Sequence, residues 1–399
     1  MRRNLGRSVV RVRRRRGSRV PDGALRSRRR HEQGDGIIAT GVAEEPSGRP
    51  ARYTGFDAVR ILAALAVVLT HSYALTGFGE RRPVVTIGHL HLGFGALGVS
   101  VFFVTSGLLV AESWQRTGRV GDFARNRFAR IWPALTVLIV LTVFVLGPLV
   151  TTVSTREYFT DRLTLKYLVR NTTLFFGTAS RLPGVFTGQP GGAVNGSLWT
   201  LPQELYVYVL LVVCALLGLL RRWWGGALLF AAFLIAWRFG HYAGAGPRGV
   251  GIDVGVVDVR LVLALGAWFF AGVALVHVPW RGIRLFGPGV VLVAAAFVCG
   301  EPVLLFLGLP MVLVALGTTS APALQVLHRI GDPSYGIYIY SFPLQQLLFR
   351  YGVATTPAPM FLLAGSVSIA LGLASWRYLE RPSLRAIKRS APSPSTHHV

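Results

Sequence analysis

The sequence is poor in charged residues and in cysteine, and both shortages narrow the choice of fold. Only 15% of its 399 residues are charged, whereas 52% are hydrophobic. A soluble domain carries about 25% charged residues because it must cover its surface with them. Lipid is therefore the expected solvent for much of this chain. The two cysteines, Cys214 and Cys299, lie in apolar segments, which excludes a disulfide framework and a metal site built from cysteine alone.

Several common site motifs are also missing. The sequence has no glycine-rich phosphate loop, no Gly-x-Ser-x-Gly nucleophile turn and no zinc-protease motif. His89 and His91 form a His-x-His pair, but no carboxylate or thiolate ligands stand close by in the sequence. We therefore expect no metal site.

Acidic residues are scarce beside basic ones. The chain has 42 Lys and Arg against 17 Asp and Glu, and thirteen of its arginines lie in the first 30 residues. Such a run could bind nucleic acid or anionic lipid. A disordered, cytoplasmic, positively charged flank before the first membrane span explains it better. We expect this segment to cover 1–51 and expect no nucleic-acid partner.

Long apolar stretches of helical period dominate the rest of the sequence. Each approaches the ~20 residues that cross a bilayer, so helices should span it and not a barrel. The expected windows are 57–75, 92–111, 131–150, 202–220, 225–240, 258–277, 286–300, 302–318, 334–350 and 359–377. We predict an all-α polytopic bundle of about ten transmembrane helices over 52–382, with no attached soluble domain and a short disordered tail at 383–399.

Basic residues between the windows indicate the orientation. With a cytoplasmic N-terminus, the inner connections are rich in arginine, as the positive-inside rule requires. They cover 112–130, 221–224, 278–285 and 319–333. The outer loops are poorer in basic residues, apart from Arg81-Arg82 and the long 151–201 segment. We predict a multi-pass protein of the cell membrane with both termini cytoplasmic.

The first window contains ionisable residues, which are costly inside a membrane unless they are paired or hydrated. Arg60 and His71 are eleven residues apart, which places them within about 20° of one helix face and about 16 Å apart along its axis. Asp57 lies one turn before Arg60 and is placed to orient it. The alternatives are a snorkelling arginine and a histidine at the membrane interface.

The fourth window opens with Glu204, the only acidic residue between Asp161 and Asp253. Pro202 suits the first turn of a helix, and the macrodipole there favours a carboxylate. Tyr208 follows one turn later. Glu204 could cap the helix at the interface, but this combination favours an active-site carboxylate.

Small and aromatic residues mark two further windows. Gly98, Ser106 and Gly107 in the second window are typical of close helix packing. The tyrosines of the ninth window, Tyr338 among them, either pack in the same way or line a substrate groove.

Together these segments resemble the integral-membrane acyltransferase-3 family of bacterial O-acyltransferases over roughly residues 52–382. The resemblance rests on motifs that occur in this order: Phe56-Asp57…Arg60-(ten residues)-His71, Gly98…Phe102-Phe103-x-x-Ser106-Gly107, Arg127-x-x-Arg130-Ile131-x-Pro133, Ser197-Leu198-Trp199-Thr200-Leu201-x-x-Glu204, Ser334-Tyr335-Gly336-Ile337-Tyr338 with Pro343, and Glu380-x-Pro382. Each motif is weak alone, whereas their joint occurrence is specific.

The resemblance implies a ten-helix core, acyl-CoA as the donor, with acetyl-CoA favoured, and a hydroxyl of a cell-envelope carbohydrate or glycosylated compound as the acceptor. It also implies that His71 and Arg60 match the family's essential pair. The extracytoplasmic esterase-like domain that many relatives carry is not found in this sequence.

We expect His71 to act as a general base on the acceptor hydroxyl, with Glu204 orienting or charging the imidazole if the two helices meet. A transient acyl carrier is the alternative role for His71. Arg60, Arg127 and Arg130 are expected at the inner face, where they could hold the phosphates of CoA.

Five further residues are expected to support the site or bind substrate: Asp57, Ser106, Trp199, Tyr208 and Tyr338. The rival function is a multi-pass transporter or flippase of a glycan or lipid-linked substrate, because such proteins also carry intramembrane charges and broken helices.

Overall fold

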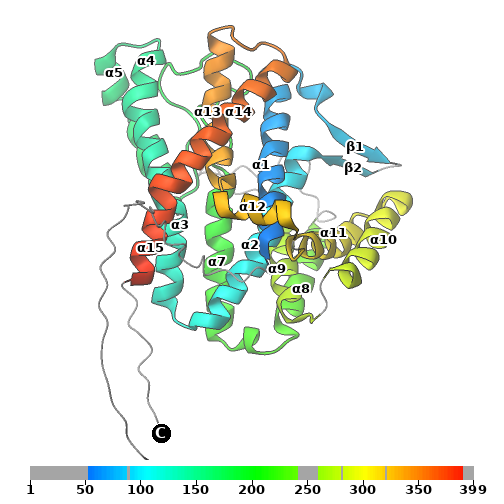
Figure 1. Ribbon diagram of the computed structural model, residues 1–399. Coiled ribbons are helices and arrows are strands. Elements are labelled where there is room, and N and C mark those ends of the chain that lie inside the picture. Colours follow the sequence, from blue (N-terminus) through cyan, green and yellow to red (C-terminus); the bar gives the residue numbers. More distant parts are fainter. Residues whose placement is uncertain (1–52, 88–89, 241–258, 280–281, 320, 390–399) are drawn as a thin grey trace, which may run out of the picture. The chain divides into compact units, whose positions relative to one another are not determined.

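A computed structural model of the protein describes residues 53–87, 90–240, 259–279, 282–319 and 321–389. This part of the chain is almost entirely helical (Figure 1), which confirms the expected all-α class. The predicted disordered segment at 1–51 lies outside the described residues, as do His89 and the end of the tail at 390–399.

The longer helices are α1 (Thr54–Leu75), α2 (Phe94–Thr117), α3 (Val120–Leu141), α7 (Thr200–Leu216), α8 (Gly225–Gly240), α9 (Val259–Ala274), α10 (Ile283–Cys299), α11 (Pro302–Gly317), α13 (Ser334–Arg350) and α14 (Pro357–Ser375). Each overlaps one of the expected apolar windows, but α3 begins eleven residues before its window at 131–150, so most of the expected inner connection 112–130 is helical. The third window also includes the π-helical turn η3 (Thr142–Leu146) and α4 (Gly147–Val150).

Membrane crossing is supported by the length and composition of several helices. Among the described residues, four helical stretches are long and apolar enough to cross a bilayer: Thr54–Leu75, Phe94–Thr117, Val120–Val150 and Pro357–Ile387. Counting α11 and α12 (Pro322–Ile330) as one bent span gives five, and α7 to α10 contribute shorter apolar helices. The protein is therefore embedded in the membrane, while the number of ten crossings stays a prediction.

Shorter elements join these helices, and hydropathy windows do not detect them because they are short or amphipathic. They are α5 (Thr155–Thr160), α6 (Arg162–Thr173), α12, α15 (Arg381–Arg389) and the antiparallel hairpin β1 (Val84–Ile87) with β2 (Leu90–Gly93). Ser154 and Asp161 cap α5 and α6 by accepting backbone N–H bonds. Because of α15, the expected tail is helical from 383 to Arg389.

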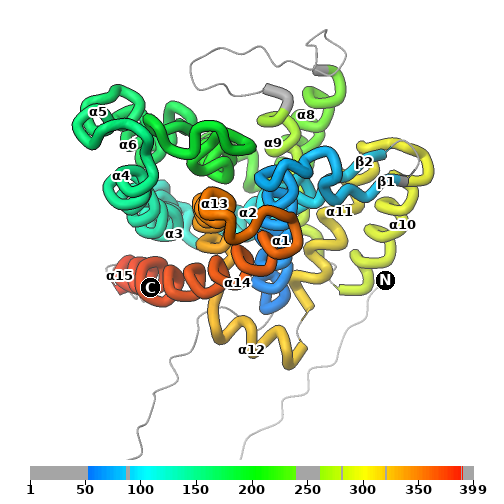
Figure 2. Tube along the Cα trace, turned by 90° about the horizontal axis from the view of Figure 1, so that it is seen from above, coloured from blue at the N-terminus to red at the C-terminus, as the bar shows by residue number. Residues whose placement is uncertain are grey.

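Helix α1 lies among α2, α13, α14 and α11 (Figure 2). Lipid gives helices no hydrophobic drive to associate, so their association depends on close packing, which small residues at the interface allow. A β-carbon on Gly98 of α2 would come within 2.5 Å of the Ala63 carbonyl oxygen of α1. Helix α2 also packs closely against α9. Gly107 of α2 faces the Phe269 carbonyl of α9, and Gly272 of α9 faces the Val104 carbonyl of α2.

A proline in α13 fixes the segment that precedes α7. Pro343 has no N–H, so the carbonyl of Ile339 one turn earlier loses its helical partner. The Asn195 side chain supplies the missing donor, with Nδ2 2.8 Å from that oxygen. A β-carbon on the neighbouring Gly196 would lie 2.5 Å from the Phe342 ring. These contacts hold the start of the Ser197–Glu204 motif against α13.

We expect Gly107→Ala to destabilise the bundle, because its added methyl group meets the backbone of Phe269. Overpacking of this kind costs about 1–3 kcal/mol, so thermal unfolding in detergent should occur at a lower temperature. Gly121→Ala on α3 is the control, since a β-carbon there meets nothing within 4 Å. Equal unfolding temperatures for the two variants would contradict the close α2–α9 crossing.

Candidate active site

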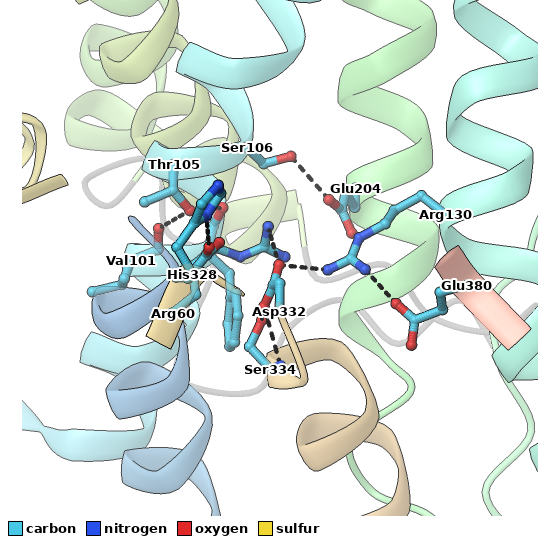
Figure 3. Close-up of polar contacts among 12 residues, drawn as sticks. Arg60, Val101, Thr105, Ser106, Arg130, Glu204, His328, Asp332, Ser334 and Glu380 are labelled. Atoms are coloured by element: carbon cyan, nitrogen blue, oxygen red, sulfur yellow. Dashed lines mark hydrogen bonds and ion pairs between the residues drawn. The ribbon is translucent and has the colours of Figure 1, made fainter. Parts of the chain in front are cut away.

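A buried polar cluster centres on Asp332, which lies two residues before the start of α13 and is 2% exposed. Its Oδ2 atom lies 3.0 Å from Arg60 Nη1 on α1 and 2.6 Å from Arg130 Nη2 on α3 (Figure 3). Its Oδ1 atom accepts from the backbone N–H of Ser334 at 3.1 Å and from the Ser334 hydroxyl. One buried carboxylate therefore joins three helices.

Arg130 is also neutralised from a second side. Its Nη1 atom donates to Oε2 of Glu380, which is fully buried. Glu380 closes the π-helical turn η6 (Trp376–Glu380), a departure from regular α-helix that is frequent at functional sites. In the same turn, the Trp376 ring lies 5.1 Å from the Arg130 guanidinium carbon and contributes a cation–π contact.

Asp57 has a different partner from the one we expected. Its Oδ2 atom lies 2.6 Å from Nδ1 of His328, on the amphipathic helix α12. Arg60, which Asp57 was expected to orient, instead forms its ion pair with Asp332. The two residues remain one turn apart on α1, but their side chains meet carboxylate and imidazole groups contributed by the segment before α13.

A second polar group links α2 and α7. Oε1 of Glu204 accepts from the Ser106 hydroxyl at 2.9 Å and from the Tyr208 hydroxyl, and the two hydroxyl oxygens are 2.7 Å apart. The guanidinium carbon of Arg127 lies 5.8 Å from the centre of the Tyr208 ring. Three of the expected supporting or catalytic residues therefore meet beside one arginine.

Arg127 differs from the other two arginines. Among the residues that the structure describes, it forms no ion pair. Its buried Nε has no hydrogen-bond partner there, a property that it shares with Nε of Arg60. Arg60 and Arg130 are both bound to carboxylates. Arg127 is thus the cation of this cluster that remains available to an anionic ligand.

His71 lies near the other end of α1. Its half-buried imidazole packs edge-on against Phe342 of α13, with ring centres 4.9 Å apart. Its Nδ1 atom is buried and has no hydrogen-bond partner within the described part of the chain. Since Arg60 contacts Phe102 of α2 at 5.7 Å and Asp332 beyond it, the Arg60–His71 face points into the bundle and not at lipid.

The expected contact between Glu204 and His71 is not formed among the described residues. Thr70, the neighbour of His71, packs on Gly95 at the start of α2, whereas Glu204 binds Ser106, eleven residues further along α2. Eleven residues of α-helix span about 16 Å. Glu204 therefore lies at the level of Arg60, because α1 and α2 run antiparallel.

Tyr338 of α13 contacts α2 and the start of α7. The Tyr338 hydroxyl is 2.8 Å from Thr200 Oγ1, and its ring packs edge-on against Phe102 at 5.5 Å. Trp199, at the start of α7, is partly buried against the main apolar core. In the described residues, no group of three or more His, Cys, Asp or Glu side chains could hold a metal ion.

Comparison with known proteins identifies the family of this chain. The model of a family described as "Acyltransferase domain", the acyltransferase-3 family, matches residues 53–377. The chain belongs to the acyltransferase-3 family. This protein is therefore an enzyme, an O-acyltransferase of the membrane, and the match favours that reading over a transporter.

The chain matches nearly the full length of three curated relatives, which cover 83–87% of this acyltransferase. It is 26% identical over 350 residues to "O-acetyl transferase" of Shigella phage Sf6, a match covering 84% of this chain and 97% of the relative. It is 28% identical over 365 residues to "Nodulation protein 10" of Rhizobium leguminosarum bv. viciae, covering 83% and 93%. "Acyltransferase MdmB" of Streptomyces mycarofaciens is 24% identical over 400 residues, covering 87% and 97%. No solved structure gives a significant match.

Asp332 and His328 were not selected from the sequence, and Glu380 was included only through the Glu380-x-Pro382 motif, without a role in the site. The sequence did indicate that acidic partners exist, because Arg60 and Arg130 lie within an apolar bundle and buried charges need counter-ions. Which acids serve as counter-ions depends on how the segment before α13 and the turn η6 return to α1 and α3. That is tertiary information.

We expect Asp332→Asn to unfold this acyltransferase more easily, because it removes the shared counter-ion of Arg60 and Arg130. Breaking a buried pair costs about 3–5 kcal/mol. Asp122→Asn is the matched control, since Asp122 pairs with Arg125 on α3 at 28% and 51% exposure, where a pair contributes about 0–1 kcal/mol. Similar unfolding temperatures for both variants in detergent would refute the central role of Asp332.

Proposed function

We propose that this acyltransferase moves an acyl group, with acetyl favoured, from acyl-CoA to a hydroxyl of a cell-envelope carbohydrate or glycosylated compound. The relatives named "O-acetyl transferase" and "Acyltransferase MdmB" support acyl transfer, and the first supports acetyl as the group. The observation that carries the proposal is the imidazole of His71, which lies inside a membrane helix and whose buried Nδ1 atom has no hydrogen-bond partner among the described residues. An ionisable group at such a position is a functional residue by default.

His71 is the general base of the proposed reaction. A neutral imidazole suits the removal of a hydroxyl proton near pH 7. As the acceptor oxygen bonds to the acyl carbon, the carbon–sulfur bond of the thioester breaks. The proton passes from the hydroxyl to the imidazole and then to the departing CoA thiolate, so the products are the ester and free CoA. If His71 instead carries the acyl group, the carbon–sulfur bond breaks as a bond forms between the acyl carbon and an imidazole nitrogen, and that bond breaks in turn when the acceptor oxygen attacks.

Arg127 is the residue we assign to the phosphates of the donor. A guanidinium binds phosphate through charge-assisted hydrogen bonds, and Arg127 has no ion pair among the described residues. Arg60 and Arg130, which we first expected to share this task, are held by Asp332 and Glu380. Their role in this proposal is to fix α1 and α3, and thereby to position His71 and Arg127.

Glu204 supports Arg127 in this scheme and not the imidazole. Its carboxylate holds Ser106 and Tyr208 in one hydrogen-bonded group, and the Tyr208 ring lies under the Arg127 guanidinium. Negative charge at Glu204 also favours a guanidinium nearby. Loss of Glu204 would therefore weaken donor binding more than it would slow the proton transfer.

The predicted topology places Arg127 and His71 towards opposite sides of the membrane. Arg127 follows the arginine-rich connection 112–130, which the positive-inside rule assigns to the cytoplasm. His71 lies near the other end of α1, towards the outer side. Acyl-CoA then enters from the cytoplasm with its phosphates at Arg127, and its flexible pantetheine arm carries the thioester towards His71.

We expect His71→Ala to lower acyl transfer by about 10²–10⁴-fold, the usual contribution of a general base. Membranes from producing cells are supplied with radiolabelled acetyl-CoA, and the mass and label of the product are measured. His91→Ala is the control, because His91 is an exposed histidine of β2. A normally folded His71→Ala protein with undiminished turnover would defeat the proposed mechanism, and label retained on rapidly quenched wild-type protein would indicate an acyl carrier.

A further inference from the structure

Unpaired hydrogen-bond acceptors gather around His71. Ser197, Gln345 and Gln346 are each fully buried. Nevertheless Ser197 Oγ and the Oε1 atoms of both glutamines have no hydrogen-bond partner within the described residues, and neither has His71 Nδ1. Buried polar atoms are almost always paired, so each exception needs an explanation.

The orientation of both glutamine amides is fixed by their other contacts. Gln345 Nε2 lies 2.9 Å from the Val68 carbonyl and 2.8 Å from Ser72 Oγ, and Gln346 Nε2 lies 2.7 Å from the Ala193 carbonyl. A carbonyl oxygen can only accept. The NH₂ groups must therefore face these carbonyls, because rotating either amide would place its oxygen against a carbonyl oxygen, with which it cannot form a hydrogen bond.

These residues occupy one place in the fold. Gln345 binds the hydroxyl of Ser72, the residue after His71. Phe342, which packs on the imidazole, is three and four residues before the two glutamines and so lies on the same face of α13. Ser197 follows Gly196, which packs closely on the Phe342 ring because glycine has no side chain. Segments from α1, α13 and the loop before α7 thus converge at His71.

The chemistry of the unpaired atoms indicates which substrate they bind. The oxygens of Gln345 and Gln346 can only accept hydrogen bonds. The thioester of the donor offers no hydrogen-bond donor, whereas each hydroxyl of a sugar offers one. We propose that Ser197, Gln345 and Gln346 form the acceptor-binding site and take a polyhydroxylated ring, with one hydroxyl at His71 and its neighbours at these three residues. This inference rests on the proposed function and adds the residues that select the acceptor.

The site therefore requires more than one hydroxyl group in its substrate. A ligand with a single hydroxyl satisfies His71 alone and leaves the other acceptors unpaired. A site built to pair substrate hydroxyls rejects analogues that lack them, because its own buried groups are then left without partners. Simple alcohols should be poor acceptors.

Ser197→Ala is the sharpest test, because the hydroxyl that it removes makes no hydrogen bond within the described protein and its loss should not disturb folding. The full-length protein in vesicles receives radiolabelled acetyl-CoA. Methyl glycosides, polysaccharide extracted from the host envelope and cyclohexanol are each titrated as acceptors. We expect transfer to at least one of the sugar acceptors and little to cyclohexanol.

With the best sugar acceptor, Ser197→Ala should raise the KM for that acceptor about tenfold, as expected for one lost hydrogen bond, and leave the KM for acetyl-CoA within about twofold. Gln346→Met should act in the same direction. Ser368→Ala on α14 is the control, since that buried hydroxyl bonds to the Gly365 carbonyl away from the site.

Three results would overturn this site. The wild-type protein could acetylate cyclohexanol as well as the sugars, or it could label only lipid or protein. The third is a folded Ser197→Ala protein with an unchanged KM for the sugar acceptor. Wild-type protein that transfers label to no acceptor at all would instead refute the proposed function itself.

Discussion

Charge inside an apolar bundle has to be neutralised by charge, and Asp332 is where this protein does so. Its carboxylate binds Arg60 of α1 and Arg130 of α3, and Glu380 completes the neutralisation of Arg130. Because uncompensated buried ions are so costly, this cluster fixes how α1, α3, α13 and the turn η6 meet. The positions of the remaining polar residues follow from that arrangement.

Two reactive groups, Arg127 and His71, lie outside this ion-pair cluster and at different levels of the bundle. Arg127 lies beside Glu204 and Tyr208 without a counter-ion in the described part of the chain, and His71 lies about three turns of α1 away from the Arg60 level. In the account proposed above, one group binds the anionic donor and the other removes the acceptor proton. In the same proposal, each substrate approaches from its own side of the membrane.

The sequence was informative where a single helix carries the signal. The Arg60–His71 face follows from helical period alone, and the apolar windows coincide with helices. It was uninformative where partners come from distant segments. Asp57 pairs with His328 and Glu204 with Ser106, over separations that no local pattern reveals. The glutamines of α13 were not singled out from the sequence, because only their contacts with Val68 and Ala193 show that their oxygens have no partner within the described part of the chain.

The most direct test of this division of labour is a cryo-electron microscopy map of the protein with a non-hydrolysable acetyl-CoA analogue. The account predicts density for the phosphates against Arg127, with the Arg60–Asp332–Arg130 pairs intact and the acetyl end reaching towards His71. Phosphates bound to Arg60 and Arg130 with Asp332 displaced, or an acetyl group remote from His71, would contradict it.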